Sequence, residues 1–228
     1  MPSDDWVVDR MQALIQDWDE RADQRAMFLK CYLMMTSNML GALREEQFID
    51  IAWVDRLLDH FAGYYFKAQE AYEQSSLLAP AVWKLAHDAT IDPDMTALQM
   101  LLLGVNAHIN YDLVLAVADM LRVEWSYLSE EQRGGRYSDY CHVNDVIRQT
   151  IDAVQDQILD PQMPVMKLID RLFGPVDEIF ISRLITDWRE VVWQDAIRLL
   201  SADIDDERNA ILTQVEERAL KISHLIRL

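Results

Sequence analysis

Residues 97–118 form a long apolar run with four polar side chains grouped in its middle, Asn106, His108, Asn110 and Asp112. A helix that is apolar on every side has to be enclosed by other elements of the protein. Burying a polar group without a hydrogen bond costs about 1–3 kcal/mol, so these four side chains need partners inside the protein or on a ligand. We therefore expect an all-α fold, a single multi-helix bundle of about seven to eight helices around this central helix.

The rest of the chain also shows helical periodicity, and no segment of useful length alternates as a strand would. The turn-forming stretch 126–138, which contains Gly134 and Gly135, is the longest predicted loop. The sequence predicts a first helix that carries Trp6 to Trp18, a short helical piece around Trp83, and the central helix. It also predicts a short helix between Pro161 and Gly174. The other predicted helices span about 22–44, 50–74, 139–159 and 176–201, and a last one begins at about 203.

Length and charge narrow the class of protein. The chain has 228 residues with 51% hydrophobic side chains and only 6 glycines, which predicts one helical domain spanning 1–228. The net charge of −18, with no basic run, argues against nucleic acids and anionic membrane surfaces as partners.

Compartment signals favour the cytoplasm. The two cysteines form no disulfide framework, and the first residues lack the basic and apolar regions of a secretory signal. The central run is about long enough to span a bilayer, but its polar centre and the lack of basic flanks predict a core helix instead.

Helical spacing divides the four central polar residues into two pairs. Asn106 and Asn110 share one side of the helix, while His108 and Asp112 share a nearly opposite side. One pocket cannot collect all four unless the helix is distorted there. We expect one pair to face a cavity and the other to tie neighbouring helices together. The His108–Asp112 pair fits a general base with its orienting carboxylate, two metal ligands, or a structural hydrogen-bonded pair.

A second polar cluster opens the helix predicted at 139–159. Asp139 and His142 stand three residues apart and can point together. If they met His108 and Asp112, the four would form a plausible site for a divalent metal. No H-E-x-x-H or C-x-x-C motif supports this set, and the alternatives are an N-cap role for Asp139 and a solvated face for His142.

Aromatic residues are candidates for the walls of a pocket. Tyr65, Trp83 and Trp188 fall on predicted helices, and Arg189 beside Trp188 is a candidate partner for a buried carboxylate such as Asp112. The leading hypothesis is a protein that binds a small organic ligand, or an enzyme, acting through His108 and Asp112. The alternative is a non-catalytic protein whose polar cluster is a core hydrogen-bond network and which acts through helix-mediated association.

The last predicted helix carries an apolar seam. Leu212, Val215, Ala219, Ile222 and Ile226 follow alternating steps of three and four residues, as in a coiled coil. Such a seam packs on the parent domain or forms the contact of a homodimer, and both interpretations stay open.

The run Asn-Ala-His-Ile-Asn-Tyr-Asp-Leu at 106–113 resembles the signature of a bacterial family of uncharacterised all-helical proteins, a domain of unknown function. Further similarity lies between about residues 50 and 200, including the stretch around Asn144 and the one from Trp188 to Ala196. The resemblance brings no established activity. It implies that Asn106, His108, Asn110, Asp112 and Asn144 belong to one feature.

Overall fold

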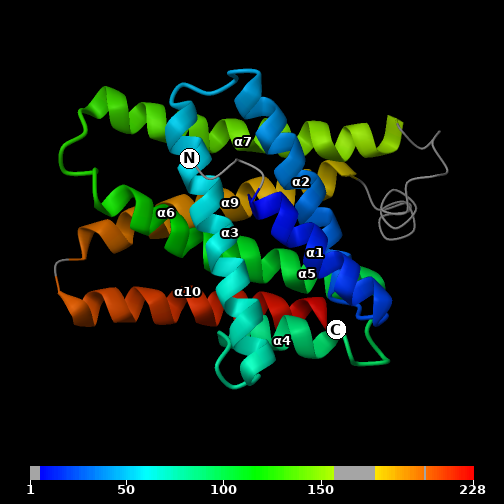
Figure 1. Cartoon of the computed structure of the whole chain (residues 1–228). Helices are drawn as coiled ribbons and strands as arrows, with labels where there is room; N and C mark the ends of the chain where they lie inside the picture. Colours follow the sequence, from blue (N-terminus) through cyan, green and yellow to red (C-terminus); the bar gives the residue numbers. More distant parts are fainter. Residues whose placement is uncertain (1–5, 157–177, 203) are drawn as a thin grey trace. The chain divides into compact units, whose positions relative to one another are not determined.

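The computed structural model describes residues 6–156, 178–202 and 204–228, and these are built from helices (Figure 1). The elements are α1 Trp6–Glu20, α2 Ala26–Arg44, α3 Ile51–Gln74, α4 Ala81–Ala89, α5 Ala97–Ala107, the π-helical turn η1 His108–Asp112, α6 Leu113–Arg122, α7 Glu130–Asp156, α9 Glu178–Ser201 and α10 Asp205–Ile226. Counting α5, η1 and α6 as one helix gives eight, and no strand occurs in this part of the chain. The all-α prediction is confirmed.

The described residues fall into two compact units. The first draws on residues 1–55 and 131–186, and the second on 56–130 and 187–228. The second unit contains the central helix and is the part of the protein that matters for the site. The expectation of a single domain stays a prediction, as does the short helix expected between Pro161 and Gly174, which lies outside the described residues.

The central helix runs from Ala97 to Arg122 and begins with a capping box. The Thr96 hydroxyl accepts from the backbone N–H of Gln99, and the Gln99 side chain accepts from the backbone N–H of Thr96. This pair satisfies two of the N–H groups that a helix start leaves unpaired. The Thr-x-x-Gln pattern therefore marks the start of the helix in the sequence.

The same helix is the one described helix that is long and apolar enough to cross a membrane by length and composition. Of the most apolar 18-residue stretch of this helix, 67% is buried inside the protein, as in the core helix of a soluble protein. The interpretation of this segment as a core helix is therefore supported by its burial.

Helix α10 packs against α4, α5 and η1 in the second unit (Figure 1). Val215 and Ala219 of its apolar seam are fully buried there. Part of the seam is thus used within the chain, as the first of the two interpretations expected, and a homodimer stays a prediction.

The loop predicted at 126–138 is wrong over most of its length, because α7 begins at Glu130. Gly134 and Gly135 lie inside the helix, each at a cost of about 1 kcal/mol relative to alanine. Tertiary contacts of the first unit favour the helix at this point. The Arg136 guanidinium binds the Asp50 carboxylate at 2.7 Å and lies 5.1 Å from the centre of the Trp53 ring.

Candidate functional site

The four central polar residues are buried, as the sequence analysis required. Asn106, Asn110 and Asp112 are at most 1% exposed and His108 is 4% exposed. Residues 108–112 form a π-helical turn between α5 and α6. Single π-turns inside α-helices are rare and are frequent at functional sites. The helix is therefore distorted at this point, yet the two pairs still contact different neighbours.

The asparagine pair ties the central helix to α10. The Asn110 amide donates to Asn106 Oδ1 at 2.9 Å. The Asn106 amide in turn donates to the Ala219 carbonyl oxygen at 2.8 Å and to Ser223 Oγ at 2.9 Å. Both ends of the Asn106 side chain are satisfied by the protein itself, so this pair fills the structural role that was expected of one pair.

The other pair joins His108 to Asp112 within the π-turn. His108 Nδ1 lies 3.1 Å from Asp112 Oδ2. Trp83 of α4 donates its indole N–H to both carboxylate oxygens, at 3.0 Å and 2.9 Å. Trp83 therefore fixes the carboxylate, and the carboxylate fixes the imidazole ring by its Nδ1 atom, in the way that orienting carboxylates hold catalytic and metal-binding histidines.

Aromatic rings surround the imidazole. Phe61 of α3 is stacked on the His108 ring, with centroids 3.7 Å apart and an interplanar angle of 9°. Tyr65 and Trp83 approach more obliquely, with centroids 6.1 Å and 6.2 Å from that of His108. Tyr65 and Trp83 also contact each other, at 5.3 Å. A role for Tyr65 and Trp83 in the wall of a pocket stays a prediction, and the sequence analysis did not name Phe61, which stands one helical turn before Tyr65 on the same side of α3.

Burial controls the charges of the pair. Burial lowers the pKa of His108 well below its usual value, so the imidazole is uncharged at neutral pH. Burial raises the pKa of Asp112 well above its usual value, and the hydrogen bond from Trp83 opposes that increase. The pair thus avoids a full ion pair in the core.

Two tyrosines near Asp112 were not predicted as site residues. The Tyr64 hydroxyl donates to Asp119 Oδ2 at 2.6 Å, and burial, Asp119 and Asp112 together raise its pKa. Burial, Glu216 and Asp112 raise the pKa of Tyr111 to about 12. Both phenols keep their protons at neutral pH, and each is partly buried.

Asp139 and His142 lie on α7 in the first unit, whereas His108 and Asp112 belong to the second. The Asp139 carboxylate accepts from the backbone N–H groups of Ile49 and Asp50, at 2.7 Å and 2.8 Å, directly before α3 begins. Asp139 therefore does not cap its own helix, which begins at Glu130, and instead holds the two residues before α3. Asp50 caps α3 by accepting from the backbone N–H of Trp53 at 3.0 Å.

His142 lies on the same helix near an exposed acid. Its Nδ1 atom is 3.3 Å from Asp145 Oδ2, and its ring meets the Phe48 ring edge-on at 5.2 Å. Over the described ranges, no three His, Cys, Asp or Glu side chains form a group that could hold a metal ion. The set of four divalent-metal ligands stays a prediction without support from this geometry.

We expect replacement of Asp139 by asparagine to lower the free energy of unfolding by about 1–2 kcal/mol, because one of two charge-assisted bonds to the segment before α3 is lost. Urea unfolding followed by circular dichroism measures this change. The matched control is Asp145→Asn on the same helix, at an exposed position, which should change stability little. Equal stabilities of the two variants would show that the two bonds of Asp139 contribute nothing.

The remaining predicted site residues are less well explained. Trp188 is partly buried, Arg189 is buried, and Asn144 is partly buried on α7. Among described residues the hydrogen-bond partners of the Asp112 carboxylate are Trp83 and His108. The suggested ion pair from Arg189 to Asp112 is therefore not formed. Roles of Trp188, Arg189 and Asn144 in a pocket stay predictions.

Comparison with known proteins identifies the chain only at the level of a family. The model of a family of unknown function (DUF5995) matches residues 5–228. No curated protein and no solved structure matches the chain. The match covers nearly the whole sequence, and the family description carries no activity.

Proposed function

The chain belongs to this family of unknown function, and we propose that it binds a small organic molecule at His108, with proton abstraction by His108 Nε2 as the chemistry the site can supply. The observation that supports the proposal most is the His108–Asp112 pair, held in a buried π-turn by the Trp83 indole. We also propose the cytoplasm as its location.

A carboxylate is a costly choice for a purely structural role at position 112. Its partners within the described residues are one indole N–H and one imidazole, and neither is a permanent cation. An asparagine there would accept the same indole hydrogen bond without the cost of burying an ionisable group. Buried ionisable groups with strongly shifted pKa values are more frequent at functional sites than elsewhere.

The contacts of the pair support one route for the proton. When Asp112 is ionised, the Nδ1 atom of His108 carries the proton that is donated to Asp112 Oδ2. The lone pair is then on Nε2, which is also buried. If Nε2 takes a proton from a substrate, the Nδ1 proton passes to Asp112, whose pKa is raised by burial. The pair changes from one negative charge to none, so no isolated imidazolium forms in the core.

Access to His108 has to involve the aromatic side chains around it. Phe61 covers one face of the imidazole ring and is itself partly exposed. A flat, mostly apolar ligand can replace that ring contact with one of its own, which fits the usual composition of small-molecule sites.

The proposal is tested by nuclear magnetic resonance with the full chain labelled at histidine and tryptophan nitrogens. We expect His108 at neutral pH to be a neutral imidazole protonated on Nδ1, and a library of small uncharged aromatic compounds to contain members that shift its resonances. Those compounds should not raise the melting temperature of His108→Gln, in which the amide keeps a hydrogen bond to Asp112.

The competing hypothesis of a core network has its own signature. The core-network hypothesis applies to Asn106 and Asn110, because their hydrogen-bond partners given above belong to the protein itself. If no compound affects His108, and His108→Gln changes stability alone, the same interpretation extends to His108 and Asp112. Elemental analysis of the purified protein tests the metal alternative, because stoichiometric zinc, iron or manganese would reassign Nε2 as a ligand.

A further inference from the structure

Gln69 of α3 is a buried amide without a hydrogen-bond partner among the described residues. Its side chain is only 2% exposed, and its Nε2 atom is buried and makes no hydrogen bond. An unmet amide donor in a protein core costs about 1–3 kcal/mol, and native proteins rarely leave one. A hydrogen-bond acceptor from outside the chain would remove that cost.

The position of Gln69 on α3 connects it with the proposed site. It lies one helical turn after Tyr65 and three residues before Tyr72, so the three share one side of the helix. Tyr65 contacts the Trp83 ring at 5.3 Å, and Tyr72 contacts the His87 ring at 4.7 Å.

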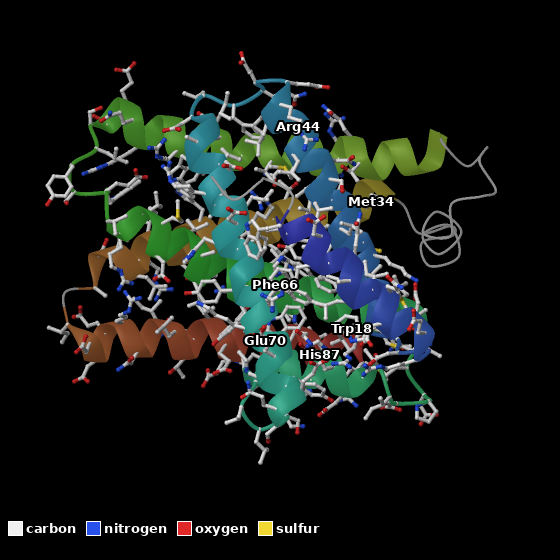
Figure 2. All side chains as sticks on the ribbon, viewed as in Figure 1. Trp18, Met34, Arg44, Phe66, Glu70 and His87 are labelled. Atoms are coloured by element: carbon white, nitrogen blue, oxygen red, sulfur yellow. The ribbon has the colours of Figure 1, made fainter. Side chains whose placement is uncertain are left out.

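The side of α4 that these two tyrosines contact carries two stacked rings. Trp83 and His87 are stacked on each other with centroids 5.3 Å apart. Figure 2 labels His87 and, on α3, Glu70, the exposed neighbour of Gln69 in the sequence. Gln69 thus belongs to the stretch of α3 whose tyrosines face the Trp83–His87 stack, and Trp83 leads from there to Asp112 and His108.

The chemistry of these side chains restricts the ligand. A glutamine side chain is neutral and offers both a donor and an acceptor, so it pairs in both directions with another carboxamide. The imidazole of His108 is uncharged, so it offers no positive charge to a carboxylate ligand. The surrounding rings favour a flat apolar body.

We propose that Gln69 binds the carbonyl oxygen of the ligand, and that the ligand is a small, uncharged aromatic carbonyl compound of the carboxamide type. This inference rests on the proposed function, since it places the reacting end of the same ligand at His108. Gln69 is a binding residue in this arrangement, and the proton is taken by His108 Nε2.

The test uses benzamide and benzoate, two probes of the same shape that differ in charge. Titration of the full chain is followed by the indole N–H resonance of Trp83, assigned with Trp83→Phe. We expect benzamide to shift this resonance and benzoate to leave it unchanged. In Gln69→Met, which keeps the length of the side chain and removes its amide, benzamide should bind about tenfold more weakly, as the loss of one hydrogen bond predicts.

Thr36→Val is the matched control, because Thr36 is also 2% exposed and its hydroxyl makes no hydrogen bond, but it lies on α2 in the first unit. Its benzamide affinity should equal that of the wild type. If Gln69→Met fails to fold, Gln69→Asn, shorter by one methylene, replaces it and should also weaken binding.

The outcomes separate this inference from the proposed function. Benzamide affinity that is lost in His108→Gln but unchanged in Gln69→Met would overturn the role of Gln69 and leave the function of His108 standing. Affinity that is unchanged in both variants would overturn both. Absence of benzamide binding to the wild type, or equal binding of benzoate, would overturn the proposed ligand class.

Discussion

Asn106→Ala is expected to lower the free energy of unfolding by about 3 kcal/mol, the upper end of the usual range for a point mutation, because a buried network is broken. The change removes the hydrogen bonds to Ala219 and Ser223 and leaves the Asn110 amide without its acceptor. It also opens a small cavity where α5 meets α10, since Asn106 is fully buried. Urea unfolding monitored by circular dichroism measures the loss.

Asn110→Ala is the comparison for this variant, because it deletes one bond of the same network and leaves Asn106 bonded to α10. Its loss of stability should be clearly smaller than that of Asn106→Ala. Similar losses for both variants would mean that the two amides contribute as one unit, and a loss near zero for Asn106→Ala would remove the case for a structural role of this pair.

Trp83→Phe is expected to produce a pH-dependent loss of stability. The indole N–H bonds both oxygens of Asp112 and opposes the increase in its pKa that burial causes. Without that donor the folded-state pKa of Asp112 rises further above its unfolded value. A carboxyl group with a raised folded-state pKa destabilises the fold above that pKa, and the penalty disappears as the pH falls towards the unfolded value.

The variant should therefore be less stable than the wild type by about 2–4 kcal/mol at pH 7, from the lost charge-assisted bond and the smaller ring. At a lower pH, at which Asp112 is protonated in the folded protein, the difference should be smaller, because protonated Asp112 no longer requires the donor. Unfolding in urea at the two pH values measures this. In an Asp112→Asn background, Trp83→Phe should cost the same at both. If the difference in the wild-type background is also independent of pH, Asp112 carries no charge in the folded protein.

Local pattern determined much of the fold. Helical periodicity predicted α2 and α3 to within a few residues, and the continuous apolar run of the central helix predicted that helix, because both patterns are visible in the sequence of the segment itself. The start of α7 was missed because Gly134 and Gly135 lower helix propensity locally. The contacts of Arg136 with Asp50 and Trp53 that favour the helix there join segments far apart in sequence.

The site was predictable in its centre and not in its surroundings. Helical spacing predicted that Asn106 would pair with Asn110 and His108 with Asp112, and both pairs are present. The π-turn that carries the second pair was not predictable from side-chain spacing. Neither was Phe61, since its contact with His108 depends on how α3 lies against the central helix.

The amino-acid sequence by itself determined that a polar group of four would be enclosed in a helical core, because apolar periodicity and burial are properties of each segment taken alone. Only the tertiary structure decided which elements contact each pair. The asparagines bind α10, and rings of α3 and α4 contact His108 and Asp112. The physical reason is that a hydrogen bond or a ring contact between distant segments depends on distance and direction in space, and helical periodicity within one segment contains neither.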